Sequence, residues 1–454
     1  MGNLFTSMLN SANALQVYSR QLAVIQNNIS NANTPGYVKQ TQELEAMRLD
    51  LSQGLAGGVA AGPVFSSRSE YAEQTVRAQF SQLGTAEQKS ADLAQVATNF
   101  DLASTTGVDA NINKFFNSFS QLSVNPNDTL SRQNVLDSAQ ALAGAFNQTE
   151  AGLSSASQQV DSQISGMVTQ VNQLTAKIRD INAMYQQNSD VASDAGLDAQ
   201  MHAALEELSE TTGITALKQS DGTFSVYLGG QTALVVGNHQ FDITVNTDQN
   251  QTTILDRSGN DITSQITAGK LAGALQEKND LIPSYVSDLN TLASSLADGV
   301  NQQLKQGIDQ NGSPPAVDMF TYDPQAGAAL SLRANTMTPD QIAAASANSP
   351  GGNENALNVA DMLKSKMMGT STYSQYFGTL GGRVGNDLAN AQSDQTTEQG
   401  LVDQARNLRS QISSVSLDQE ATELLQVQRS YQASAKVMGV LNDIMDTLMQ
   451  TVRP

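Results

Sequence analysis

The sequence predicts a mainly α-helical protein with an inserted β domain, and three observations support this fold class. Apolar residues recur at three- and four-residue steps near both ends of the chain, which is typical of paired helices. A tract from about residue 70 to 208 has the character of long helices. From about Thr212 the apolar period changes to two, which indicates strands. We therefore expect an α+β fold: terminal helices that pair as a coiled coil, an elongated helical body and a small antiparallel β domain.

The N-terminal segment is expected to form a helix with a narrow apolar seam, which then stops at a dense turn signal. The stretch NNISNANTPGYVKQ follows the seam, and its Asn and Thr side chains can bond their own backbone in competition with the helix. Pro35 and Gly36 fit the centre of a type II turn. The seam comprises Leu4, Met8, Leu15, Tyr18, Leu22, Ile25 and Ile29, and the turn motif comprises Asn28, Asn31, Thr34, Pro35, Gly36 and Tyr37.

The helical body is expected to follow a linker. Residues 51–64, LSQGLAGGVAAGPV, have the Gly/Ala-rich composition of a loop. Within the tract that follows, the stretch Asn125-Pro126-Asn127-Asp128 should end one helix, and Asp128 or Thr129 can cap the next. A third heptad run extends from Val160 to Tyr185. The spacing therefore predicts at least two long helices before the strands.

The strands and the second helical part come next. Phe224, Val226 and Leu228 alternate with polar residues before a Gly-Gly turn, and the predicted β-meander ends near Ile266. A helical run from Leu271 to Val300 contains Pro283, which should kink the helix or shift its start. Residues 353–415 are predicted to return to helix.

The C-terminal segment repeats the pattern of the N-terminal one. Two seams at opposite ends of one chain suit pairing with each other or with neighbouring copies. The alternative is that each is an ordinary core-facing helix. The C-terminal seam comprises Leu424, Val427, Tyr431, Ser434, Met438, Leu441, Met445 and Leu448.

The predicted domain organisation has five segments. They are an N-terminal axial helix and turn (1–50) that pairs with the C-terminal axial helix (405–454), a first part of the helical body (51–211), an inserted β domain (212–268), and a second part of the body with variable loops (269–404).

Composition excludes several classes of function. The 454 residues include 44 acidic and 24 basic side chains, for a net charge of −20, which argues against nucleic acid or an anionic membrane surface as partner. There is no cysteine, so disulfides and thiolate metal sites are excluded. We recognise no signal peptide and no run long enough to span a membrane.

No residues suggest catalytic, cofactor-binding or metal-binding chemistry. The two histidines, His202 and His239, are far apart and belong to no ligand motif. The stretch Asp309-Gln310-Asn311-Gly312 lacks the full ligand pattern of a calcium loop and is expected to be a surface turn. Carboxylates are plentiful, so a secreted hydrolase using paired acids stays a remote alternative.

Both ends of the chain resemble the shared terminal motifs of bacterial flagellar axial proteins, the family of rod, hook and hook-associated proteins. NNISNANTPGYVKQ resembles the N-terminal motif, although Val38-Lys39 stand where Ser-Arg is expected. SLDQEATELLQVQRSYQASAKVMGVLNDIMDTLMQ resembles the C-terminal one, centred on residues 431–436. FFNSFSQLSVNPNDTLSRQNVLDSAQALAGAFNQ and GKLAGALQEKNDLIPSYVSDLNTLASSLADGVNQQLKQGIDQNG look like the helical domain of hook-associated members.

The resemblance implies a structural subunit and not an enzyme. It implies a ring at the junction of hook and filament, built through terminal helices that form the innermost tube. It also implies export by the flagellar type III apparatus without a cleaved signal peptide. The implied partners are further copies of the chain, the hook protein, hook-associated protein 3, and an export chaperone at the C-terminal region. Alternatives are the hook protein or another rod or hook axial subunit, and a coiled-coil adhesin.

Overall fold

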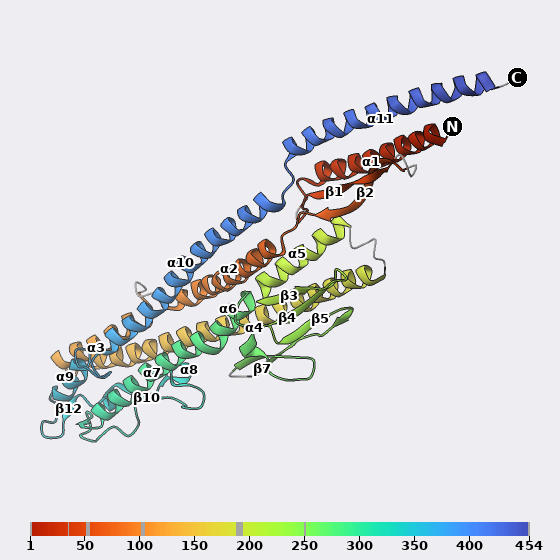
Figure 1. Ribbon diagram of the computed structural model, residues 1–454. Coiled ribbons are helices and arrows are strands. Elements are labelled where there is room, and N and C mark those ends of the chain that lie inside the picture. Colours follow the sequence, from red (N-terminus) through yellow and green to blue (C-terminus); the bar gives the residue numbers. More distant parts are fainter. Residues whose placement is uncertain are drawn as a thin grey trace. The chain divides into compact units, whose positions relative to one another are not determined.

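The computed structural model describes residues 2–34, 36–50, 55–100, 105–187, 194–248 and 251–452 (Figure 1). The chain is 66% helical with small antiparallel sheets, so the predicted α+β class is confirmed. It divides into two compact units. Unit 1 contains residues 1–82, 171–242 and 398–454, and unit 2 contains residues 83–170 and 243–397. No helix in the described ranges is both long and apolar enough to cross a membrane.

Unit 1 holds both terminal helices, a long β-hairpin and a four-stranded sheet. Helices α2, α4 and α10 contribute residues to both units. The elements with residues in unit 1 are α1 (Gly2–Asn31), β1 (Gln40–Asp50), β2 (Leu55–Ser66), α2 (Glu70–Ala97), α4 (Thr129–Gln187), α5 (Ala195–Thr211), β3 (Ile214–Lys218), β4 (Phe224–Leu228), β5 (Thr232–Val236), β6 (His239–Gln240), α10 (Tyr373–Ser413) and α11 (Leu417–Val452).

The predicted linker at residues 51–64 is wrong over residues 55–64, which lie in strand β2; residues 51–54 lie outside the described ranges. Strand β2 pairs antiparallel with β1, from Gln40 opposite Ser66 to Asp50 opposite Leu55. The pairing is irregular between Gln42 and Leu44. Strand β2 also packs against α1. The small residues of β2 allow this close packing, and the same Gly/Ala composition is also typical of a linker.

The predicted β-meander is confirmed for the sheet β3–β4–β5–β6, in which each strand pairs antiparallel with the next. Asn182 of α4 holds this sheet, since its side chain donates to the carbonyls of Phe224 and Gly237 and accepts from the Phe224 N–H. The predicted meander, which was expected to continue to about Ile266, is interrupted after β6. Residues 241–243 are in no strand, and Thr244 begins a separate hairpin.

Unit 2 is a helical body with short two-stranded pairs. Besides its parts of α2, α4 and α10, it contains the 3₁₀ helix η2 (Thr98–Phe100), α3 (Val108–Val124), β7 (Thr244–Asp248), β8 (Gln251–Leu255), η4 (Thr263–Gln265), α6 (Lys270–Gln276), the π-helix η5 (Glu277–Leu281), α7 (Ile282–Leu304), β9 (Gly307–Ile308), β10 (Phe320–Thr321), α8 (Ala328–Ser331), β11 (Arg333–Ala334), η6 (Pro339–Gln341), β12 (Ala345–Ser346) and α9 (Glu354–Asp361). Strands β7 and β8, β9 and β12, and β10 and β11 pair antiparallel.

The helix boundaries in unit 2 follow the local chemistry. Helix α3 ends at Val124, and the Asp128 side chain accepts from the Ser131 N–H at 2.8 Å, which caps α4. Helix α7 starts at Ile282, directly after the π-helix η5, so Pro283 lies in its first turn and not in its interior. Asp309 accepts from the N–H groups of Asn311 and Ser313, which confirms the predicted surface turn.

Aromatic side chains fill one part of the unit 2 core. Phe115 contacts Phe116, Phe119 and Phe320 edge to face, with ring centroids 5.2–5.4 Å apart. Phe116 stacks on Tyr373 of α10 at 5.9 Å. These contacts join α3 to α10 and β10 with aromatic geometry that is favourable beyond simple burial.

Candidate assembly site

The two terminal helices lie against each other, which confirms their predicted contact (Figure 1). Helices α1 and α11 come from opposite ends of the sequence and belong to the same unit. The β1–β2 hairpin packs on α1 as well. These four elements form the candidate assembly site.

The predicted N-terminal seam is only partly covered in the single chain. Ile25 is buried at 2% exposure, whereas the other seam residues are half-buried. Among the residues of α1 whose exposure is described, Val17 and Asn28 are also buried, and the seam prediction left both out. The half-buried members are Leu4, Met8, Leu15, Tyr18, Leu22 and Ile29.

The predicted C-terminal seam is the least exposed face of α11. Val427 is buried, and Leu424, Ser434, Met438, Leu441 and Met445 are half-buried. Tyr431 and Leu448 are exposed at 39% and 37%.

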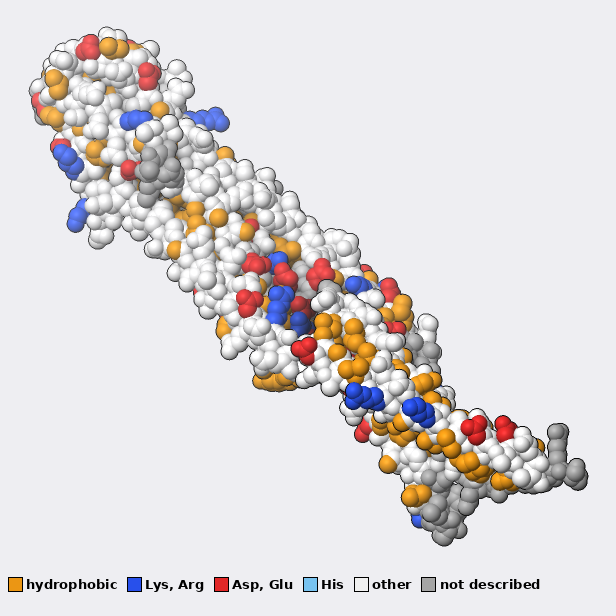
Figure 2. All heavy atoms as spheres, turned by 90° about the horizontal axis from the view of Figure 1, so that it is seen from above, with side chains coloured by type: hydrophobic (Ala, Val, Ile, Leu, Met, Phe, Trp, Pro, Cys, Tyr) orange, Lys and Arg blue, Asp and Glu red, His pale blue; other side chains and the backbone are white. Residues whose placement is uncertain are grey.

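A second row of apolar side chains lies beside this seam and points to solvent. It consists of Val437, Val440 and Ile444, and we call it the outer stripe; their exposed fractions are 51%, 58% and 44%. Figure 2 shows hydrophobic side chains gathered along α11. Helix α11 therefore carries more apolar surface than α1 covers.

Asn28 joins the two termini. It is 1% exposed and uses both ends of its amide. The nitrogen donates to the Gln40 carbonyl at 2.8 Å and to the Glu420 carboxylate at 3.0 Å. The oxygen accepts from the Gln40 N–H and the Tyr37 hydroxyl, each at 2.9 Å. Asn28 thus bonds the hairpin and α11, and not its own backbone as the turn interpretation supposed.

Glu420 is the counterpart of Asn28 on α11. Its carboxylate is fully buried and pairs with the Lys39 ammonium at 2.8 Å. Burial, and then the charge of Glu420, raise the pKa of Tyr37 to about 12, so this phenol stays a hydrogen-bond donor at physiological pH. The Lys39 N–H also donates to the Ser413 carbonyl, at the end of α10. The segment after the turn is therefore bonded to both C-terminal helices.

The turn motif itself forms as predicted where the structure describes it. The Tyr37 N–H bonds the Thr34 carbonyl at 3.1 Å, and Gly36 has φ +75°, as a type II turn requires. Asn31 donates back to the Asn27 carbonyl, and the Thr34 hydroxyl donates to Asn31. Pro35 lies outside the described residues.

Replacing Gly36 with alanine is expected to destabilise unit 1 by about 1–2 kcal/mol, the cost of a left-handed conformation for a residue with a Cβ. The new Cβ would also lie 3.0 Å from the Ala199 carbonyl oxygen of α5. Urea denaturation measures the loss. Gly144→Ala is the control, since that helical position has open space. Equal stabilities of Gly36→Ala and the parent chain would contradict this account of the turn.

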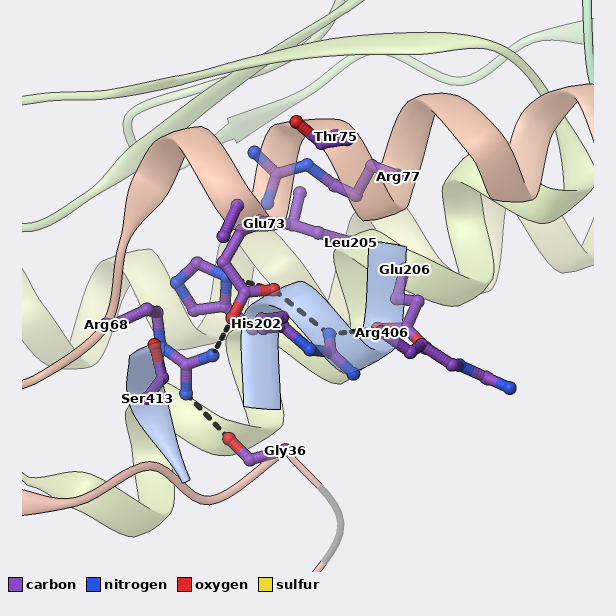
Figure 3. A network of polar contacts seen from close by, with 12 residues as sticks. Gly36, Arg68, Glu73, Thr75, Arg77, His202, Leu205, Glu206, Arg406 and Ser413 are labelled. Atoms are coloured by element: carbon purple, nitrogen blue, oxygen red, sulfur yellow. Dashed lines mark hydrogen bonds and ion pairs between the residues drawn. The ribbon is translucent and has the colours of Figure 1, made fainter. Parts of the chain in front are cut away.

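Arg68 anchors the turn to the body of unit 1 (Figure 3). Its side chain is 5% exposed. The guanidinium donates to the Gly36 carbonyl at 2.6 Å, to Asp198 of α5 at 2.7 Å and to Glu73 of α2 at 2.5 Å. One arginine thereby links the turn to two helices.

Arg409 extends the network to α10. It bonds Glu73 at 3.2 Å and Glu206 of α5 at 2.7 Å. Burial alone would lower the pKa of Arg409, but the hydrogen bond and charge of Glu206, together with Glu73, raise it. Arg406, one turn earlier on α10, lies over the Phe80 ring at 4.4 Å. Glu73 therefore pairs with both Arg68 and Arg409, and only 2% of its side chain is exposed.

His202 lies inside this network but has no hydrogen-bond partner among the described residues. Its ring nitrogens are 3.9 Å from Glu73 and 3.7 Å from Asp198. Burial, and then the positive charges of Arg68 and Arg77, hold the pKa of His202 well below its usual range. His239 lies at the exposed start of β6. Within the described ranges, no three His, Asp or Glu side chains are placed to hold a metal ion.

Sequence reasoning missed the residues that hold the site together. They are Gln40, Arg68, Glu73, Asp198, Glu206, Arg409 and Glu420. One signal could have found two of them: only 15% of the residues are charged, and Arg68 and Glu73 flank the start of a predicted helix. Hydrogen-bonded partners within the site are up to 392 residues apart, a relation that local spacing cannot reveal.

Comparison with known proteins decides the family. A family model described as the flagellar hook-associated protein FlgK helical domain matches residues 93–320, half of the chain. The chain belongs to the FlgK family of flagellar hook-associated proteins. Its termini match two broader descriptions: flagella basal body rod protein at residues 8–37, and flagellar basal body rod FlgEFG protein C-terminal at residues 409–451.

Relatives of this FlgK-family chain match it over its full length. It is 24% identical to flagellar hook-associated protein 1 of Bacillus subtilis, over 99% of this chain and 98% of that protein. Flagellar hook-associated protein 1 of Escherichia coli is 22% identical to it, over 99% of this chain and 100% of that protein. The structure of the flagellar hook junction protein FlgK from Burkholderia pseudomallei shares the fold, with a TM-score of 0.68 and 17% identity over 74% of this chain and 99% of that one.

The family assignment settles the main alternatives. FlgK proteins are structural, non-enzymatic proteins of the hook–filament junction, so this chain is a structural component of the flagellum and not a hydrolase. The termini match models named for rod proteins, and the interior match distinguishes the hook-associated family from the hook protein.

Proposed function

We propose that this chain forms the junction ring between hook and filament by packing its terminal helices against those of neighbouring copies. The observation that carries the proposal is the uneven covering of α11. Asn28 and Glu420 join the two termini at one end of α11, whereas Val437, Val440 and Ile444 stay exposed. Apolar rows on one helix gain stability when further helices cover them.

The predicted seams supply the contact surfaces in this proposal. The half-buried side chains of both seams would lose their remaining exposure when neighbouring copies add helices. In this proposal each of the five predicted segments has a place in the ring. Residues 1–50 and 405–454 form the axial tube, and residues 51–211, 212–268 and 269–404 lie outside it. The network around Arg68 would hold the axial part at a constant angle to the rest of unit 1.

The proposed partners and route follow from this role. The ring would contact other copies of itself, the hook protein on one side and hook-associated protein 3 on the other. The chain would reach this place outside the cell through the flagellar type III apparatus, without cleavage of a signal peptide. Before export, a chaperone would cover the C-terminal region, where apolar side chains of α11 are exposed.

Deleting residues 424–454 is expected to abolish filament attachment while the rest of the chain stays folded. The deletion removes the C-terminal seam and the outer stripe, but leaves Glu420 and the network around Arg68. The truncated gene is introduced into a strain that lacks the gene, with the full-length gene as control. Electron microscopy should show hooks without filaments and immunoblots should show flagellin in the medium, while circular dichroism of the purified variant keeps the remaining helix signal. Normal swimming of the truncated strain would refute the proposal.

A further inference from the structure

We propose that the β1–β2 hairpin of one copy packs against the outer stripe of α11 in the next copy, so that neighbouring subunits join head to tail. This inference rests on the proposed function and names the surface through which the ring assembles. Two different surfaces would meet, which makes the contact heterologous; such contacts close into rings or continue as helices.

The hairpin provides the first surface. Every residue of β1 from Glu43 to Leu49 is exposed, on both faces of the ribbon. Three of them are large and apolar: Leu44 at 39%, Met47 at 47% and Leu49 at 65% exposure. Charged residues (Glu43, Glu45 and Arg48) lie next to them, so the ribbon offers both apolar and charged groups to a partner. Helix α1 packs mainly against β2 and touches β1 less, and the residues of β1 from Glu43 to Leu49 stay exposed.

The outer stripe provides the second surface, and its spacing matches the hairpin. Val440 and Ile444 of the outer stripe are four residues apart, and Lys436, which is not part of the stripe, precedes Val440 by the same step of about 6 Å along a helix. On β1, Glu45, Met47 and Leu49 alternate to one face at steps of about 7 Å. Placed side by side, the helix and the strand bring Glu45 to Lys436, Met47 to Val440 and Leu49 to Ile444.

The order of charge and apolar groups favours this alignment. Glu45 precedes the two apolar residues of the strand, as Lys436 precedes those of the helix. Neither has an ion-pair partner among the described residues, and both are exposed. Figure 2 shows cationic side chains beside hydrophobic ones on α11. A second copy of the chain therefore supplies both the apolar cover and the opposite charge.

Cysteine crosslinking tests the alignment directly, because the chain has no cysteine of its own. The double variant Met47→Cys and Val440→Cys is expressed in a strain lacking the gene, and isolated flagella are oxidised. We expect a ladder of disulfide-linked multimers on a non-reducing gel. The matched control is Met47→Cys with Asp446→Cys, since Asp446 lies two residues past Ile444 on another face of α11. This control should give no ladder.

Each outcome has a clear meaning. Filaments that attach normally without a ladder, or an equal ladder in the control, would overturn the hairpin contact and leave the junction role intact. A crosslink to the hook protein or to another flagellar protein would also overturn it, by naming a different occupant. A full-length gene that fails to restore filaments would overturn the junction role together with this inference.

A charge exchange provides a second measurement. Glu45→Lys in the Met47→Cys and Val440→Cys background should lower the yield of multimers about three-fold, as expected for one exposed ion pair. Adding Lys436→Glu should restore the yield. A loss that Lys436→Glu does not restore would refute the proposed alignment.

Discussion

Replacing Arg68 with methionine is expected to lower the free energy of unfolding of unit 1 by about 3–5 kcal/mol, the range found when one partner of a buried ion pair is removed. The guanidinium is the shared donor to Gly36, Glu73 and Asp198. Methionine can fill part of the volume but donates nothing. Among the described residues, Glu73 would keep Arg409 as its cationic partner, and the Gly36 carbonyl would lose its bond to Arg68.

Hydrogen exchange and urea denaturation can measure this effect. Amide protons in the first turns of α2 and in the turn at Gly36 should exchange faster in Arg68→Met. The matched control is Arg179→Met, in the same unit, because Arg179 is 37% exposed and pairs with the exposed Asp180. That change should cost less than about 1 kcal/mol. Similar losses in both variants would show that the Arg68 network does not anchor the turn.

A double replacement separates the contribution of the Arg68–Glu73 ion pair to stability from the contribution of Arg68 alone. Arg68→Met with Glu73→Met should cost less than the sum of the two single changes, because the second removes a charge that the first leaves partly unpaired. Additive losses would indicate that Arg68 acts through packing alone.

Replacing Glu277 with glutamine is expected to reduce strongly the pH dependence of stability in unit 2. Glu277 begins the π-helix η5 and is fully buried, and neither of its carboxyl oxygens has a hydrogen-bond partner among the described residues. Its surroundings are tight. Gly273, one turn earlier, lies so close to α2 that a Cβ would be 2.8 Å from the Thr85 carbonyl oxygen.

The charges around Glu277 make its ionisation unfavourable. Burial, followed by the charge of Asp92, raises the pKa of Glu277 to about 8; Asp387 also raises it and Lys89 lowers it. The carboxyl group is therefore mostly protonated at pH 7 in the folded chain. Its usual value of 4.5 applies when the chain is unfolded.

The sign of the effect follows from these two values. Because the folded pKa is the higher one, the contribution of Glu277 to stability is complete below about pH 4.5 and is lost as the pH rises to 8. Between pH 5 and 8 the loss amounts to about 3 kcal/mol, at roughly 1.4 kcal/mol per pKa unit. Glutamine cannot ionise, so over this range the variant should lose about 3 kcal/mol less stability than the parent chain. Burial also raises the pKa of Glu150, in the same unit, to about 7, so Glu150 should still make the stability of the variant depend on pH.

Urea denaturation at several values between pH 5 and 8 measures this difference. The control is Glu87→Gln, also in unit 2, whose carboxylate is 32% exposed and faces Lys270 at 3.6 Å. The free energy of unfolding of the control should change with pH as steeply as that of the parent chain. Equal slopes for Glu277→Gln and the parent would show that Glu277 is ionised in the folded state.

Local patterns were sufficient for the helices, the sheet and the family. The heptad seams predicted two terminal helices that contact each other, and Asp128 capped the helix that it was expected to cap. Alternation between Phe224 and Leu228 placed the meander. These features depend on residues a few positions apart, so periodicity and turn chemistry reveal them.

Composition was misleading where packing decided the conformation. The Gly/Ala-rich stretch at residues 55–64 is a strand because α1 and β1 lie beside it. Asn28 was expected to bond its own backbone, yet it bonds Gln40 and Glu420 because folding buries it between the hairpin and α11. An asparagine side chain can bond either its own backbone or a distant segment, and the residues packed around it decide which bond forms.

The sequence by itself determined the helical architecture, the pairing of the termini and the membership of the flagellar axial family. The tertiary structure alone decided how the termini are fastened. Glu73 meets Arg409 across 336 residues and Asn28 meets Glu420 across 392, and each pair forms because folding removes both partners from water together. A buried charge or amide must find a partner wherever the fold provides one, and the linear order of residues does not record that partner.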